Sequence, residues 1–159
     1  LGGSCQDGNL YSSVDLPPKN EYLPTGNWLV ISKIGVLTEI GESSTENHED
    51  TLKKGVWRVP DFANPTQGVT FPTILVAHKY GYLTWSNDFR RQNSFYNLDK
   101  LEIGDTFEII WDQRRFVYEI YAGEEGKDIT DYKADVILYT CKHLNSPVRI
   151  FRYARRVEY

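Results

Sequence analysis

The chain has 159 residues, 40% of them hydrophobic and 25% charged, which is typical of one globular domain with a core of its own. Its net charge is −4 and it contains no dense basic tract, which argues against nucleic acid as a partner. No apolar run approaches the roughly 20 residues that a membrane-spanning helix needs.

Strand patterns dominate the chain after a polar start. Residues 1–27 are polar and interrupted by proline, and we expect them to form a flexible arm leading into a domain of residues 28–159. Short apolar segments rich in Val, Ile and aromatic residues then alternate with turn residues, which is typical of β-strands. The predicted strands, in chain order, are residues 28–34, 36–40, 73–78, 106–111, 116–121, 134–141 and 148–157.

The connections between these strands show little helical character. Residues 41–50 (GESSTENHED) are polar and predict a loop, and residues 51–72 are irregular and contain proline. In residues 79–100, we expect Asn87 or Asp88 to cap a short helical turn. With about eight strands, at most short helices and no alternation of strand and helix, the sequence predicts an all-β fold, closed as a barrel.

Cys141 is the first candidate for chemistry. It ends a strongly apolar segment just before a loop, so we expect its thiol to lie at the rim of the barrel. A thiolate in such a place is a nucleophile, whereas a lone cysteine is more commonly a buried core residue. The other cysteine, Cys5, lies in the Gly- and Ser-rich start of the chain, and a disulfide between the two is not expected.

Arg149 is the second candidate because only seven residues separate it from Cys141. If the two flanking strands pair as a hairpin, Arg149 opens the strand beside the one that Cys141 closes. A guanidinium carries five donors in a fixed fork and suits the oxygen of a bound carbonyl group. A solvated charge at a strand end is the alternative interpretation.

The three histidines differ in what they can reach. His48 lies in an acidic loop and is expected to be solvated, and His143 lies in a loop that does not fix its direction. His78 leaves an apolar strand where a neighbouring strand can bring Cys141 beside it. A Cys and a His that meet in space form a plausible catalytic pair, although His78 alone is equally consistent with a core or surface histidine.

Several segments together resemble the sortase family. The sequence ILYTC with Arg149 resembles the motif Thr-Leu-x-Thr-Cys followed by an arginine on the next strand, and LVAHK (75–79) resembles a strand that ends in Gly-His-Arg. Three longer segments are similar to further sortase blocks in the correct order, and the match covers residues 28–157. They are WLVISKIGVLTEI (28–40), LKKGVWRVPDFANP (52–65) and FYNLDKLEIGDTFEIIWDQRRFVYEI (95–120).

Three residues depart from the sortase motifs. Ile137 replaces the first Thr of the cysteine motif, Ala77 replaces the Gly before the histidine, and Lys79 replaces the Arg after it. None of these changes removes a catalytic side chain. They leave the subclass and the substrate motif open.

The resemblance implies an eight-stranded β-barrel with short helices in its connections, and a cysteine transpeptidase activity. It implies cleavage of a C-terminal Leu-Pro-x-Thr-Gly sorting signal through a thioester, followed by transfer to an amine. The implied catalytic residues are Cys141, His78 and Arg149, and the implied substrate-binding residues are Thr140, Ala77 and Tyr139. Since attack requires a thiolate beside an imidazolium, we predict a slow enzyme with a bell-shaped pH–rate profile.

The resemblance also implies partners and a location. The expected partners are the sorting-signal peptide of surface proteins and an amine from a cell-wall precursor or a pilin. The expected location is the extracytoplasmic face of the bacterial membrane, with the anchor upstream of Leu1. No cofactor is expected, and the acidic segment ENHED (46–50) is only a weak match to the calcium-binding carboxylates of sortases.

Two other functions remain open at this point. One is a thiol hydrolase that uses the same site with water as the acceptor. The other is a non-catalytic β-barrel that binds peptide or sugar through aromatic residues, with a structural Cys141. The aromatic residues that favour this second alternative are Trp57, Tyr80, Tyr82 and Trp85.

Overall fold

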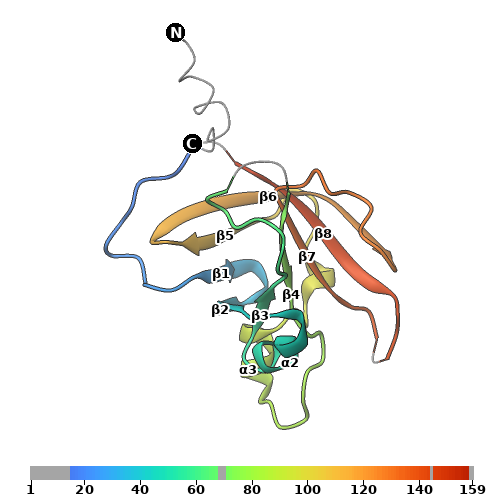
Figure 1. Cartoon of the computed structure of the whole chain (residues 1–159). Helices are drawn as coiled ribbons and strands as arrows, with labels where there is room; N and C mark the ends of the chain where they lie inside the picture. The colour runs from blue at the N-terminus through green and yellow to red at the C-terminus, as the bar shows by residue number, and fades with distance from the viewer. Residues whose placement is uncertain (1–14, 68–70, 144, 158–159) are drawn as a thin grey trace.

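The computed structural model describes residues 15–67, 71–143 and 145–157, and more and less buried side chains alternate along three of its strands, Trp28–Ile31, Val36–Glu42 and the first half of Arg114–Gly126. Strands with one buried face cover that face by closing on themselves. The eight strands are β1 (Trp28–Ile31), β2 (Val36–Glu42), β3 (Val56–Arg58), β4 (Thr73–Val76), β5 (Thr106–Trp111), β6 (Arg114–Gly126), β7 (Val136–Cys141) and β8 (Arg149–Arg156). They form a closed barrel in the order β1-β2-β3-β4-β7-β8-β6-β5, which confirms the predicted fold (Figure 1).

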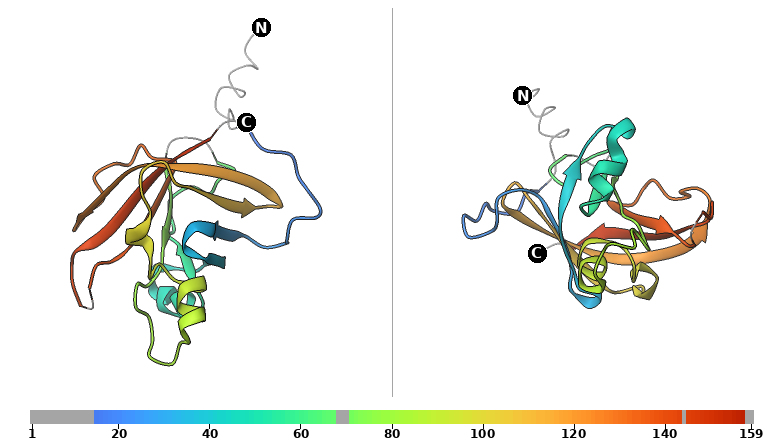
Figure 2. Two further views of the ribbon diagram at one scale, coloured as in Figure 1. Left: turned by 180° about the vertical axis from the view of Figure 1, so that it is seen from behind. Right: turned by 90° about the horizontal axis from the view of Figure 1, so that it is seen from below.

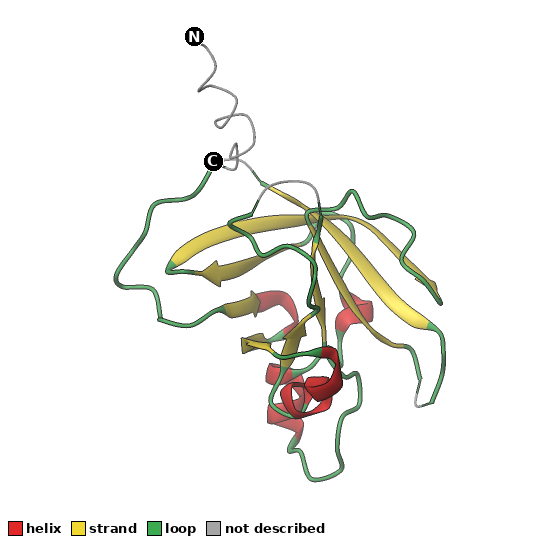
Figure 3. Ribbon diagram, in the orientation of Figure 1, coloured by secondary structure: helices red, strands yellow, loops and turns green. Residues whose placement is uncertain are grey.

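The helices are short and occupy connections. The α-helices are α2 (His48–Leu52) and α3 (Asn87–Asn93), and the 3-10 helices are η1 (Ser32–Ile34), η2 (Thr45–Asn47) and η3 (Leu98–Lys100). Both α-helices lie at the lower end of the barrel in Figure 3. Among the described residues, no helix is long and apolar enough to cross a membrane.

Two hydrophobic clusters divide the buried side chains. The lumen cluster fills the barrel and takes alternate residues from all eight strands, for example Leu75 of β4 and Leu138 of β7. The outer cluster covers the opposite face of β4, β7 and β8, where it contains Ile137 and Phe151. Strand β8 is also paired with β6, and the two strands run side by side in Figure 2. The three strands β4, β7 and β8 are therefore buried on both faces.

The pairing of β4, β7 and β8 sets the geometry at one end of the barrel. Strand β4 runs parallel to β7, with Val76 opposite Tyr139. Strand β8 runs antiparallel to β7, with Arg149 opposite Cys141. The end of β4, from a distant part of the sequence, and the start of β8 thus both lie beside the end of β7 at Cys141.

Several boundaries of strands and helices that the residue pattern predicted were wrong. Residues 32–34 turn into η1 because the chain must reverse before β2. The predicted loop 41–50 contains the end of β2 and most of α2, and the irregular segment 51–72 contains β3. The helical turn near residue 87 begins with Ser86 as its cap, not Asn87 or Asp88, since the Ser86 hydroxyl accepts a hydrogen bond from the Phe89 N–H at 3.0 Å.

The described part of the predicted arm, residues 15–27, contains no helix or strand and contacts the β5–β6 turn. The Asn20 N–H donates to the Gln113 carbonyl at 2.9 Å, and the Gln113 side-chain amide donates to the Leu23 carbonyl at 3.0 Å. Residues 1–14, including Cys5, lie outside the described residues. The domain boundary at residue 27 stays a prediction.

Gly41 of β2 sets how closely α2 packs on the barrel. A Cβ atom at this position would lie 2.3 Å from Cγ2 of Thr51 on α2. We expect Gly41→Ala to lower the free energy of unfolding by about 1–3 kcal/mol, because it overpacks this contact. Thr51→Ser removes the obstructing methyl group, so urea unfolding of the double variant is expected to recover part of the loss. Additive effects of the two substitutions would contradict this packing.

Candidate active site

Cys141 and Arg149 face each other at the ends of β7 and β8. They are direct partners in the antiparallel register, and the Lys142 N–H donates to the Val148 carbonyl at 2.9 Å one step beyond them. Cys141 is exposed and carries a free thiol. Direct partners in antiparallel strands have Cβ atoms about 5 Å apart on the same face of the sheet. The guanidinium and the thiol therefore leave the sheet side by side.

The alternation of side chains shows which face this is. Ile137 and Tyr139 precede Cys141 at steps of two, and both belong to or pack on the outer cluster. On β8, Phe151 of the same cluster follows Arg149 at a step of two. Cys141 and Arg149 therefore project from the outer face of the barrel and not into its lumen.

Tyr139 connects Arg149 with the outer cluster. The Arg149 guanidinium carbon lies 5.6 Å from the centre of the Tyr139 ring, and its Nη1 donates to the Lys127 carbonyl at 3.1 Å. Burial raises the pKa of Tyr139, and the neighbouring Cys141 adds to this rise while Arg149 opposes it. Tyr139 is thus a neutral aromatic surface that supports the guanidinium beside Cys141.

His78 follows the last residue of β4 by two positions. The Ala77 N–H still donates to the Tyr139 carbonyl at 3.4 Å, so the parallel pairing with β7 continues past the strand end. Carried one residue further, this register would bring His78 level with Cys141. Val76 packs on the outer cluster, and the same alternation would direct His78 to that face.

Glu49 is the partner of His78 and was missed by the sequence analysis. Its carboxylate lies 2.9 Å from His78 Nε2, and the Tyr82 hydroxyl donates to the same carboxylate oxygen. Partial burial alone would raise the pKa of Glu49, but the hydrogen bonds from Tyr82 and His78 outweigh it and hold this pKa below its usual value. Burial and the bond to Glu49 raise the pKa of Tyr82 to about 12.

The segment after His78 is tied down at several points. The Arg90 guanidinium donates to the Tyr80 carbonyl at 2.7 Å and to the Tyr82 carbonyl at 2.8 Å. Gly81 has a φ of +68°, and a Cβ atom there would lie 2.0 Å from the Trp85 ring. Only glycine therefore allows this turn, which packs the Tyr82 and Trp85 rings against His78, with ring centres 5.7 and 6.3 Å from the imidazole.

Thr140 and Ala77, both predicted to bind substrate, are buried within the barrel wall. Thr140 is 1% exposed and its hydroxyl donates to the Ala77 carbonyl at 2.7 Å. This bond joins β4 to β7 next to Cys141. In this structure the hydroxyl holds the two strands together, and Tyr139 is the predicted substrate residue that shares the face of Cys141.

The other two histidines occupy different surroundings. His48, predicted to be solvated, begins α2, where its Nδ1 lies 2.5 Å from the Thr45 carbonyl and its ring centre lies 5.3 Å from that of Trp57. His143 is exposed in the connection after Cys141. Within the part of the chain that the structure describes, no group of three or more His, Cys, Asp or Glu side chains is arranged to hold a metal ion.

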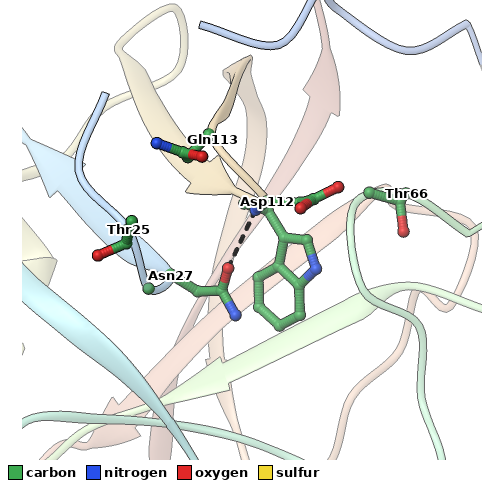
Figure 4. A pocket seen from close by; sticks show the side chains of 7 residues that line it. Thr25, Asn27, Thr66, Asp112 and Gln113 are labelled. Atoms are coloured by element: carbon green, nitrogen blue, oxygen red, sulfur yellow. Dashed lines mark hydrogen bonds between the residues drawn. The ribbon is translucent and has the colours of Figure 1, made fainter. Parts of the chain in front are cut away.

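A separate pocket of about 500 Å³ lies at the β5–β6 turn (Figure 4). Asn27 and Asp112 meet in it, where the Asn27 side-chain oxygen accepts a hydrogen bond from the Asp112 N–H at 3.1 Å. None of the three predicted catalytic residues lines this pocket. The lining residues are Thr25, Gly26, Asn27, Thr66, Trp111, Asp112 and Gln113.

Comparison with known families places the chain. The Sortase domain family matches residues 29–157, so the chain belongs to the sortase family. Sortases are cysteine transpeptidases that act at the cell surface and in general need no cofactor for catalysis. Among curated proteins, no sequence relative matches the chain.

Solved sortase structures share the fold at low sequence identity. Sortase A from Corynebacterium diphtheriae, a lid mutant, is 19% identical with a TM-score of 0.70, and the match covers 97% of this chain and 91% of that one. Streptococcus pneumoniae sortase C is 19% identical with a TM-score of 0.69, covering 97% and 86%. Sortase C1 of GBS pilus island 1 is 23% identical with a TM-score of 0.68, covering 84% of this chain and only 64% of that one.

The buried hydroxyl of Thr140 provides a test of the β4–β7 connection. We expect Thr140→Val to lower the free energy of unfolding by about 1–3 kcal/mol, because it leaves a carbonyl without its donor in a buried place. Thr38→Val is the matched control, since Thr38 is equally buried but its hydroxyl reaches a carbonyl only at 3.5 Å. Equal losses in urea unfolding would contradict a special role for the Thr140 bond.

The raised pKa of Tyr82 predicts a change of stability at high pH. The neutral phenol is favoured in the folded state, so its contribution is complete below about pH 10 and is lost as the pH rises towards about 12. We expect the native protein to lose stability in this window more steeply than Tyr82→Phe. Urea unfolding at pH 8 and at about pH 11 measures both slopes, and parallel slopes would show that Tyr82 does not titrate as described.

Proposed function

We propose that this chain is a cysteine transpeptidase that cleaves a Leu-Pro-x-Thr-Gly type of sorting signal and transfers the product to an amine. The observation that carries this proposal is the convergence of three strand ends on one face. Cys141 and Arg149 are paired there, and His78 follows the parallel neighbour β4. A nucleophile, an acid–base group and a fixed cation are the groups that amide exchange requires.

In the first half of the proposed reaction, the Cys141 thiolate attacks the Thr carbonyl carbon of the sorting signal. The C–S bond forms and the carbonyl oxygen becomes an anion, which the Arg149 guanidinium stabilises. When the C–N bond breaks, the His78 imidazolium gives its proton to the leaving amine. A thioester on Cys141 and a neutral His78 remain.

In the second half, an incoming amine attacks the thioester carbonyl. Neutral His78 accepts the proton that the amine nitrogen loses, and the C–S bond breaks to return the thiolate. The new amide bond joins the sorted protein to the acceptor. The charges on Cys141 and His78 are then the same as at the start, so no external acid or base is consumed.

The outer cluster provides a surface for the apolar part of the sorting signal. Phe62 packs beside it, and the Phe62 ring centre lies 6.1 Å from that of Tyr132 and 6.2 Å from that of Phe71. Phe71 and Tyr132 are 56% and 52% exposed. Large aromatic groups left in water on the face that carries Tyr139 suit the Leu-Pro end of such a peptide.

The proposed partners are the sorting signal of a surface protein and an amine of a cell-wall precursor or a pilin. Two of the similar solved structures are described by their pilus island and by pilin substrate specificity, which supports the pilin alternative. We propose that the protein acts at the extracytoplasmic face of the membrane and that it is membrane-anchored. This location follows the cell-surface action of sortases in general.

The binding-barrel alternative is disfavoured by where its aromatic residues lie. Trp57 is 6% exposed, and the Tyr82 and Trp85 rings pack against each other with centres 5.3 Å apart beside His78. These rings pack against other protein groups and do not form an exposed surface on which a sugar could stack. The exposed thiol of Cys141 also differs from a structural cysteine.

The proposed activity is tested by mass spectrometry with a Leu-Pro-x-Thr-Gly peptide library and glycinamide as the amine. We expect an acyl-enzyme and a ligated product that are absent from Cys141→Ala.

Arg149→Lys keeps the charge but loses the fork of donors, and we expect the rate of ligation to fall about a hundredfold, as for the loss of an oxyanion donor. Arg155→Lys on the same strand is the matched control and is expected to keep the native rate.

The outcomes separate the alternatives. Cleavage without ligation at high glycinamide concentration would identify a thiol hydrolase. An Arg149→Lys variant as active as Arg155→Lys would remove Arg149 from the mechanism. A Cys141 thiol that resists alkylation in the folded protein would contradict the transpeptidase and favour the binding barrel.

A further inference from the structure

We infer that Glu49 is a positioning residue for His78: it fixes the hydrogen on Nε2, so that Nδ1 is the nitrogen that exchanges a proton with the substrate. This inference rests on the proposed transpeptidase function and assigns a role to a residue of α2, outside the three strands that carry the predicted catalytic groups. The 2.9 Å contact between the Glu49 carboxylate and His78 Nε2 is its starting point.

The charge of Glu49 decides which nitrogen carries the hydrogen. An ionised carboxylate only accepts hydrogen bonds, so the His78 nitrogen beside it must be the donor. The Tyr82 hydroxyl donates to the same oxygen, and together the two bonds keep the pKa of Glu49 below its usual value. Glu49 is therefore ionised at neutral pH, and His78 has its hydrogen on Nε2 whether the ring is neutral or charged.

The carboxylate is held in place by both of its supports. On one side, Leu52 of α2 is buried, and Thr51 contacts Gly41 of β2 so closely that no side chain fits between them. On the other side, the carbonyl of Tyr82 is bound by Arg90, which fixes the phenol that reaches Glu49. A carboxylate that is fixed from two elements can orient an imidazole, whereas a mobile surface glutamate cannot.

Other charged or titratable groups belong to the elements around His78. On α2, His48 precedes Glu49 and Asp50 follows it. Lys79 is paired with Asp99 at 2.9 Å, and the ends of β7 and β8 contribute Cys141 and Arg149. Glu49 is the charged group that bonds to the imidazole. In the proposed mechanism it orients the imidazole that acts with Cys141, as the aspartate orients the histidine in a Ser-His-Asp triad.

The tests are Glu49→Gln and Tyr82→Phe, with Glu46→Gln as the matched control because Glu46 is an exposed acidic residue of the same segment. Turnover is measured with a Leu-Pro-x-Thr-Gly peptide and glycinamide. We expect Glu49→Gln to lower kcat about ten- to a hundredfold with little change in the KM of the amine, since acid–base catalysis is impaired and binding is not. Tyr82→Phe is expected to lower kcat several-fold, and Glu46→Gln to have no effect.

The nitrogen chemical shifts of ¹⁵N-labelled histidine give a readout that does not depend on turnover. We expect the neutral His78 ring to have a protonated Nε2 and an unprotonated Nδ1 in the native protein, and to be a mixture of both tautomers in Glu49→Gln. His78→Asn identifies the His78 signals among the three histidines. If Glu49→Gln fails to fold, Tyr82→Phe is expected to show the same mixing to a smaller extent.

The inference and the proposed function fail in different ways. A native protein without transpeptidase activity but with the expected tautomer would overturn the function and leave the positioning intact. An active enzyme in which Glu49→Gln keeps the native kcat and tautomer would overturn the positioning role. A raised KM for glycinamide at unchanged kcat would also overturn it, and would make Glu49 part of the amine-binding site.

Discussion

The parallel pairing of β4 with β7 is the constraint on which the rest of the site depends. The two strands are far apart in the sequence, and two parallel neighbours can be joined only by a long connection. Residues 77–135 supply it as the His78 segment, α3 and the β5–β6 hairpin, which closes the barrel on its other side. One pairing therefore closes the barrel and brings the end of β4 to the end of β7.

The same pairing explains why the cysteine strand lacks a polar face. Strands β4, β7 and β8 are covered by the lumen cluster on one side and by the outer cluster on the other, so the successive side chains of β4 and β7 are mostly apolar. Only at the strand ends does the outer cluster stop, and there Cys141 and Arg149 emerge. The thiol of Cys141 is thus fixed at the end of a doubly buried strand and is still exposed.

The strands of this site were predictable because their signals are local. The apolar run that ends in Cys141 and the short connection to Arg149 define a hairpin without help from the rest of the chain. The pairing of β4 with β7 is not local, and only the order of sortase-like segments suggested it. Helix α2 was missed because its five residues have no helical period of their own, and its position depends on the contact between Thr51 and Gly41.

Glu49 was missed for the same reason. In the sequence it is one of several acidic residues in ENHED, which is equally consistent with a solvated loop or a weak cation site. Its partner His78 is 29 positions away, and neither the spacing nor the residue types predict that the two meet. The other partner of Glu49, Tyr82, depends on a turn at Gly81 that the sequence marks only by the glycine itself.

The two charges beside the proposed catalytic pair serve different atoms. Arg149 is the register partner of Cys141, so in the proposed reaction its guanidinium faces the oxyanion that forms when the sulfur attacks the carbonyl carbon. The Glu49 carboxylate is bonded to Nε2 of His78, so it orients the imidazole that exchanges the proton. The two charges come from separate elements, β8 and α2, and each lies nearest the group with which it acts.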